Sequence, residues 1–226
     1  MHEAHLSSCE KFITLMGGCS YPNSAVSPIN EDQIWNGYPH EGAAAYSSAK
    51  KMNIVMSESY RTQFNFNSLV LVPGNIYGPY DNFDLENSHV LPAMIRKFHE
   101  AKEDNHASVV LWGSGSPLRE FLHVDDLAQA VLFALEHKLD NHLYNVGSGS
   151  DLTIKALAEM IQKNVGHSGD IFWDETKPDG TPKKLMDSSK LNSLGWRSTI
   201  DLEKGIKMTY DWFLEYIKSF KELDIN

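Results

Sequence analysis

The chain has 226 residues, of which 42% are hydrophobic, 11% aromatic and 22% charged, and this composition is typical of a globular protein and excludes a disordered chain. A net charge of -10 with no block of Lys or Arg argues against nucleic-acid binding, and no apolar run reaches the about 18 residues of a membrane span. Two cysteines exclude a disulfide framework, and the first 30 residues lack a secretory pattern, so we expect a cytoplasmic protein.

Two short apolar segments at 11–16 and 68–72 end at Gly17 and Pro73, which is the pattern of buried strands stopped by loops. A helix is predicted between them, over about 44–63. Its apolar stripe consists of Ala49, Met52, Val55, Met56 and Tyr60. The strand-helix-strand order predicts a parallel βαβ unit.

The second half of the chain continues the alternation. Strands are predicted at 109–112, 143–146 and 171–173. Helices are predicted at 125–136 and 201–219, and a third helix is predicted to begin directly after its capping residue, Thr153. The buried face of the helix at 125–136 is predicted to be Ala128, Val131, Leu132 and Leu135. Segments 74–88 and 176–184 have no periodicity and are predicted to be loops. The fold class is therefore α/β, with part of a doubly wound parallel sheet.

Tyr46 and Lys50 are the strongest local signal for chemistry, because four residues along a helix place both side chains on one face. A phenol has a pKa near about 10, so a neighbouring cation helps it to exchange a proton at neutral pH. By itself this pattern also fits an ordinary pair on a helix surface.

Two loops follow the ends of the first two predicted strands, at 17–22 and 73–83. Ligands of open α/β sheets bind at the carboxyl ends of the strands, so these loops and the Tyr46 helix can converge on one cleft.

From about Lys11 to Ser219 the order of motifs resembles the GDP-L-fucose synthases, a family of extended short-chain dehydrogenases within the NAD-dependent epimerases/dehydratases. The motifs are Cys19-x-Tyr21-Pro22, Tyr46-x-x-x-Lys50, Pro73-x-Asn75-x-Tyr77-Gly78-Pro79, Asn87-Ser88-His89-Val90, Trp112-Gly113-x-Gly115-x-Pro117-x-Arg119-Glu120-Phe121 and Lys177-Pro178-Asp179-Gly180. Each motif is modest alone, and together they are specific.

The resemblance implies an activity and roles for single residues. The activity is 3,5-epimerisation of GDP-4-keto-6-deoxy-mannose followed by NADPH-dependent reduction at C4. Tyr46 would donate the proton during reduction, Lys50 would activate it, and Cys19 and His89 would move protons during epimerisation. A thiol and an imidazole suit that task because both titrate within reach of neutral pH. Without the resemblance, Cys19 would be an ordinary small buried residue and His89 a surface histidine.

Binding residues are implied in the same way. The nicotinamide end of NADP would contact Lys50, Pro73, Gly74, Asn75, Ile76 and His89. The sugar nucleotide would contact Lys97, Trp112, Arg119 and Asp179. An arginine fork suits a diphosphate, and an indole face suits packing. The family also implies a homodimer, formed through helices that include the one carrying Tyr46. No metal is implied.

The domain organisation follows from the same comparison. Residues 1–80 are expected to be the remnant of an NADP-binding Rossmann domain, and residues 81–226 mainly a substrate-binding lobe, with about 120–150 returning to the Rossmann sheet. The family's Gly-x-x-Gly-x-x-Gly turn is not found: Gly113-Ser114-Gly115 and Gly147-Ser148-Gly149 lack a third glycine. We therefore expect this chain to bind NADP weakly or not at all.

A second departure from the family is Gly17, which occupies the position of a Ser or Thr that polarises the substrate carbonyl. Three alternatives stay open. The chain could act on another nucleotide sugar, which Gly17 favours, or it could be a non-catalytic binding remnant. A zinc site, suggested by ten histidines and by His2-Glu3-Ala4-His5, lacks a distant ligand set.

Overall fold

The computed structural model describes residues 1–223, which form two compact units. Unit 1 comprises Met1–Ile76, Glu120–Ser150 and Lys184–Thr199. Unit 2 comprises Tyr77–Arg119, Asp151–Lys183 and the described part of Ile200–Asn226. The chain passes between the units five times, and three of these points lie within the strands β3 (Asn75–Tyr77), β5 (Leu118–His123) and β9 (Lys183–Lys184).

Unit 1 is built on a parallel sheet in the order β1-β2-β6. Its elements are α1 (His2–Leu6), β1 (Phe12–Leu15), the 3-10 turns η1 (Gly18–Ser20), η2 (Glu31–Trp35) and η3 (Glu41–Ala43), α2 (Ala44–Phe64), β2 (Ser68–Pro73), α4 (Val124–Glu136), β6 (Leu143–Val146) and α6 (Ser189–Asn192). The β1-α2-β2 segment confirms the predicted parallel βαβ unit.

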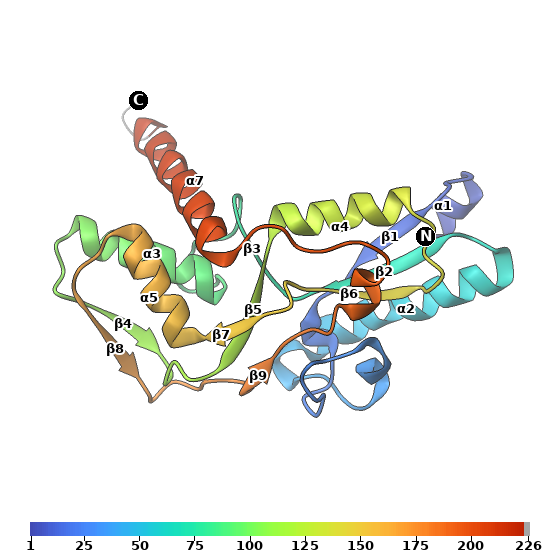
Figure 1. The fold of residues 1–226 in the computed structure, drawn as a ribbon, viewed down its shortest axis with the longest axis horizontal. Coiled ribbons are helices and arrows are strands. Elements are labelled where there is room, and N and C mark those ends of the chain that lie inside the picture. Colours follow the sequence, from blue (N-terminus) through green and yellow to red (C-terminus); the bar gives the residue numbers. More distant parts are fainter. Residues whose placement is uncertain (224–226) are drawn as a thin grey trace. The chain divides into compact units, whose positions relative to one another are not determined.

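The central strand β2 is buried along its whole length, because its two faces pack on different helices. Leu69 and Leu71 lie in a core cluster with Ala130 and Ala134 of α4. Val70 and Val72 lie in a second cluster with Ile54 of α2. Successive side chains of a strand point to opposite faces, so α2 and α4 cover opposite sides of the sheet, as Figure 1 shows.

The apolar stripe predicted on α2 does not face the core. Met52, Val55 and Met56 are 53%, 40% and 37% exposed. The buried face instead consists of Ser47, Lys51, Ile54 and Ser57. Small serines can be buried here because they have partners: Ser57 Oγ lies 3.0 Å from the hydroxyl of Ser68 on β2.

The predicted buried face of α4 is wrong for Ala128, Leu132 and Leu135, whereas Val131 packs against the core as predicted. Leu132 and Leu135 are 47% and 46% exposed, whereas the buried residues are Asp126, Ala130 and Ala134. Alanines allow the helix to approach the sheet closely, and the Asp126 carboxylate accepts hydrogen bonds from the Thr199 amide at 2.9 Å and hydroxyl at 3.0 Å. Hydrophobic spacing therefore identified only one of the residues that face the sheet.

Unit 2 contains a parallel strand pair and three helices. Its elements are α3 (Val90–Glu103), β4 (Ser108–Trp112), β7 (Asp151–Thr153), α5 (Ile154–Val165), β8 (Asp170–Asp174) and α7 (Leu202–Leu223), with β4 paired to β8. The predicted cap of α5 is confirmed, since Thr153 Oγ1 accepts a hydrogen bond from the Ala156 amide at 3.0 Å. The segments predicted as loops at 74–88 and 176–184 contain the strands β3 and β9, which are too short to show periodicity.

Two absences hold for residues 1–223. No helix in this range is long and apolar enough to cross a membrane. Likewise, no group of three or more His, Cys, Asp or Glu side chains in the described chain is arranged to hold a metal ion.

Candidate active site

Tyr46 and Lys50 lie together at the start of α2. Lys50 Nζ is 5.5 Å from the centre of the Tyr46 ring and donates a hydrogen bond to the carbonyl oxygen of Leu15 at 3.0 Å. Leu15 is the last residue of β1, so the ammonium group is held at the carboxyl end of a sheet strand. The Tyr46 side chain is half exposed and accessible to a ligand.

Gly17 separates the Tyr46 hydroxyl from the Cys19 thiol. A methyl group added at Gly17 would lie 3.3 Å from Cys19 Sγ and 3.6 Å from Tyr46 Oη. The phenol and the thiol therefore flank the same backbone position, immediately after β1. Gly17 has φ -121° and ψ 149°, an extended conformation that any residue adopts, so nothing in the backbone requires glycine here.

The electrostatics of this group favour a protonated phenol. Partial burial raises the pKa of Tyr46, and the nearby Cys19 thiolate raises it further. A phenol that keeps its proton at neutral pH can serve as a proton donor. Ser20, the neighbouring hydroxyl that could replace the missing family Ser or Thr, is fully buried.

The loop after β2 is fixed from two sides. The amide of Gly74 donates to the carbonyl oxygen of Val146 on β6 at 3.0 Å, and Asn75 Nδ2 donates to the carbonyl oxygen of Glu120 at 2.8 Å. This places Pro73–Ile76 at the carboxyl end of the sheet, the edge at which open parallel sheets bind ligands.

Glu120 is a residue of this site region that sequence reasoning missed. It is 1% exposed, and its carboxylate accepts hydrogen bonds from the amides of Gly149 at 2.8 Å and Met186 at 3.0 Å. Burial raises its pKa, whereas these amides lower it. A side chain at Gly74 would approach Glu120 Oε2 to 3.0 Å. The sequence signals were its place in the motif Arg119-Glu120-Phe121 and its position directly before the apolar Phe121 and Leu122.

The four residues predicted to contact the sugar nucleotide form a second group, in unit 2. Lys97 Nζ lies 5.7 Å from the centre of the Trp112 ring, which is 63% exposed. The Asp179 carboxylate accepts hydrogen bonds from the amide and the hydroxyl of Ser114, both at 2.7 Å. These bonds, together with the charge of Arg119, lower the pKa of Asp179.

The hydrogen bonds from Ser114 show that Asp179 stabilises a turn. Gly113 has φ +80°, and a Cβ there would collide with Asp179 Oδ1. Asp179 thus fixes the turn that follows Trp112, and the turn needs glycine both for its conformation and for this close approach.

His89 is the remaining predicted catalytic residue. It is the exposed residue that precedes α3. Burial raises the pKa of the nearby Asp81, and the Asn82 amide and His89 oppose this shift. His89 belongs to unit 2, whereas Cys19 belongs to unit 1.

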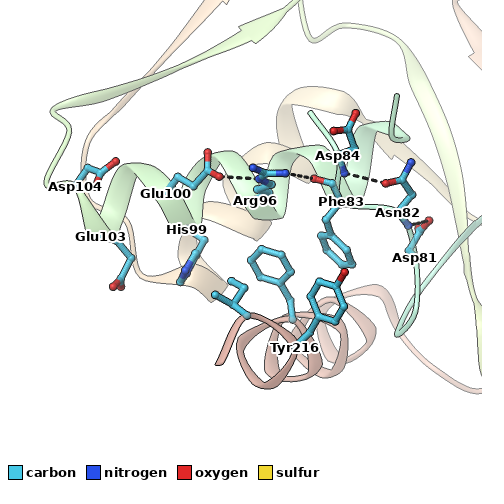
Figure 2. A pocket seen from close by; sticks show the side chains of 12 residues that line it. Asp81, Asn82, Phe83, Asp84, Arg96, His99, Glu100, Glu103, Asp104 and Tyr216 are labelled. Carbon is cyan, nitrogen blue, oxygen red and sulfur yellow. Dashed lines mark hydrogen bonds and ion pairs between the residues drawn. The ribbon is translucent and has the colours of Figure 1, made fainter. Parts of the chain in front are cut away.

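A cavity of about 650 Å³ in unit 2 is lined by none of the predicted site residues (Figure 2). The stacked rings of Phe83 and Phe213 contribute apolar lining, and five carboxylates contribute negative charge. Arg96, its one arginine, is paired with Glu100 at 2.7 Å. This negatively charged lining repels phosphate, so the group around Trp112 is the better candidate for binding a nucleotide.

Comparison with known proteins places these groups in context. The sequence model of the NAD dependent epimerase/dehydratase family matches residues 1–147. A rice protein named probable GDP-L-fucose synthase 1 is 50% identical to this chain, and the alignment covers 95% of this chain and 66% of the rice protein. GDP-L-fucose synthase of Escherichia coli K12 is 44% identical, covering 98% of this chain and 72% of its own length.

Solved structures agree with these relatives. A GDP-L-fucose synthetase from Naegleria fowleri bound to NADP has a TM-score of 0.89 at 28% identity, over 95% of this chain and 69% of that chain. A GDP-D-glycero-L-gluco-heptose synthase from Campylobacter jejuni with NADPH has a TM-score of 0.82 at 35% identity, over 95% of this chain and 72% of that chain. The chain thus spans about two thirds of the length of the proteins that it matches.

Proposed function

We propose, on the premise that this chain belongs to the NAD dependent epimerase/dehydratase family, that it is an NADP-dependent epimerase/reductase of a GDP-linked 4-keto-6-deoxy hexose. The observation that carries the proposal is the grouping of Tyr46, Lys50 and Cys19 around Gly17 at the carboxyl end of β1. Curated relatives named GDP-L-fucose synthase support GDP-4-keto-6-deoxy-mannose as the substrate.

Epimerisation requires removal and return of a proton at C3 and at C5, the carbons beside the C4 ketone. The ketone makes these protons removable, and a base and an acid are needed on the two faces of each carbon. We assign Cys19 and His89 to these proton transfers.

Reduction at C4 requires a hydride and a proton. NADPH supplies the hydride when it is bound. Tyr46 gives its proton to the C4 oxygen, which becomes basic as the hydride arrives. Lys50, Pro73–Ile76 and His89 are the residues that would hold the nicotinamide end. Lys50 and Pro73–Ile76 fit this role because they lie at the carboxyl ends of the adjacent strands β1 and β2.

Substrate recognition is assigned to unit 2. Trp112 offers an exposed ring to a base or a sugar, and Lys97 and Arg119 offer cations to the diphosphate. Asp179 holds the turn beside Trp112. The division of the chain into a cofactor part at 1–80 and 120–150 and a substrate part over the rest stays a prediction.

Gly17→Ser is expected to raise the rate of C4 reduction by at least about tenfold, because it restores a hydroxyl beside Tyr46 that can hydrogen-bond the substrate carbonyl. The extended backbone at Gly17 accepts serine, and Cys19 Sγ at 3.3 Å needs to shift only slightly. The measurement is NADPH oxidation at saturating substrate, with Gly17→Ala as the control for bulk. An equal rate in the serine variant and the unsubstituted chain would mean that another donor already polarises the carbonyl.

Turnover on a panel of keto-sugar nucleotides tests the proposed substrate. A second candidate function is that of a related enzyme that uses another nucleotide sugar. Gly17 favours it, because the family's Ser or Thr at this position supplies the hydroxyl that polarises the substrate carbonyl. Production of GDP-L-fucose from the 4-keto-6-deoxy-mannose compound supports the first candidate. Preferential turnover of a different keto sugar supports the second, and no turnover of any compound supports a binding remnant.

We further propose a cytoplasmic homodimer. The exposed stripe of Met52, Val55 and Met56 on α2 supports it, since contiguous apolar side chains on a helix surface mark interaction sites. A charge substitution there, Met56→Glu, would be expected to shift the sedimentation coefficient toward that of a monomer.

A further inference from the structure

Lys177 shares the Trp112 ring with Lys97. Lys177 Nζ lies 5.4 Å from the ring centre and Lys97 Nζ lies 5.7 Å from it, both within the about 6 Å range of cation-π contacts. Lys177 follows β8 in a turn in which its amide donates to the carbonyl oxygen of Asp174 at 3.1 Å. This turn brings the start of the Lys177–Gly180 motif back beside the end of β4.

The charges of these two lysines are not balanced by close partners. Among residues 1–218, whose side chains the structure describes, neither forms an ion pair within 4 Å, whereas Lys183 pairs with Asp151 at 3.2 Å. The charge of Lys177 contributes to lowering the pKa of Asp174, but the larger contributions come from the hydroxyl and the amide of Thr176, which donate hydrogen bonds to the Asp174 carboxylate. Lys97 is half-buried, and burial lowers its pKa, so an anion that restores its solvation is favoured.

The ring of Trp112 is exposed, and the two ammonium groups beside it belong to no ion pair, although Lys97 Nζ also donates a hydrogen bond to the carbonyl oxygen of Val110 at 3.2 Å. On a chain of net charge -10, this group is suited to a ligand that combines a ring with phosphate. The ring offers a face to a base or sugar, and the ammonium groups offer point charges to phosphate oxygens. Lysine stems are long and flexible, so Lys177 can follow a phosphate that the half-buried Lys97 reaches from the other element.

We propose that Lys177 binds a phosphate of the nucleotide sugar together with Lys97, so that the two lysines and Trp112 form one nucleoside-diphosphate subsite. This inference rests on the proposed function, which supplies the GDP-linked substrate. It adds a substrate-binding residue that neither helix periodicity nor the four family positions singled out.

Calorimetric titration of the chain with GDP tests the assignment. Lys177→Gln should weaken GDP binding by about tenfold, which is the loss of one charge-assisted contact. Lys204→Gln is the matched control, because Lys204 is an exposed lysine of α7 in the same unit and its removal changes the net charge equally. It should leave GDP affinity within about twofold.

The outcomes separate the inference from the proposed function. GDP binding by the unsubstituted chain with equal affinity in Lys177→Gln would overturn the inference alone. The inference would also be overturned if Lys177→Gln weakened guanosine binding as much as GDP binding, because the lysine would then not contact a phosphate. Absence of GDP binding in the unsubstituted chain would contradict the proposed function and the inference with it.

Discussion

Tyr46→Phe is expected to lower the rate of C4 reduction by about 10²–10⁴-fold, the usual contribution of a positioned general acid. The substitution removes only the hydroxyl that lies beside Gly17 and Cys19, and the ring and its contact with Lys50 remain. Affinity for the GDP-linked substrate should therefore stay within about twofold. Single-turnover oxidation of NADPH gives the rate, and calorimetric titration with GDP gives the affinity.

Tyr60→Phe is the matched control for this experiment. Tyr60 lies on the same helix, and its hydroxyl lies 2.9 Å from His2 Nδ1, away from the Tyr46 group. Its loss should leave reduction unchanged. A reduction rate in Tyr46→Phe equal to that of the Tyr60 variant would remove Tyr46 from the mechanism. Lys50→Met should lower the rate and also raise the concentration of NADPH required, because Lys50 is assigned to both tasks.

Cys19→Ser combined with His89→Gln is expected to reduce hydrogen exchange at C3 and C5 of the substrate by about 10²-fold or more. Serine and glutamine keep the approximate size of the native side chains and cannot exchange a proton near neutral pH. The measurement is deuterium incorporation from heavy water into GDP-4-keto-6-deoxy-mannose without NADPH, so that reduction does not contribute.

Cys9→Ser controls for the general loss of a thiol. Cys9 is the other free cysteine, exposed and with Sγ 3.1 Å from the carbonyl oxygen of Lys11. Exchange in this variant should match that of the unsubstituted chain. Undiminished exchange in the double variant would show that other groups carry the proton transfers.

The order of elements was largely predictable from the sequence, because short β-branched runs and capped helices carry local signals. β6 was predicted at its observed bounds, and the Thr153 cap was found. The orientation of α4 was not predictable from hydrophobic spacing, because its buried face uses alanines and an aspartate that is satisfied by Thr199. Hydrogen bonds between segments distant in sequence decide such cases, and a local pattern does not contain them.

The candidate site shows the same limit. Tyr46 and Lys50 could be assigned from their four-residue spacing on a helix, and Cys19 from the family resemblance. The structure adds that Tyr46 contacts Lys50 and that Tyr46 and Cys19 lie on either side of Gly17. Glu120 was missed because its partners at Gly149 and Met186 come from two other segments of unit 1. Lys177 belongs to a family motif, but no role was predicted for it, because its position beside Trp112 appears only in the structure.

Incubation with GDP-4-keto-6-deoxy-mannose and NADPH in heavy water tests the central claim most directly, because one product reports both half-reactions. NADPH is supplied in large excess, because the chain lacks the family's glycine-rich turn and weak NADP binding is expected of it. The account predicts that the GDP-L-fucose formed carries deuterium at C3 and C5 and equals the NADPH consumed. A reduced product without deuterium at these carbons would contradict the assignment of epimerisation and reduction to this chain.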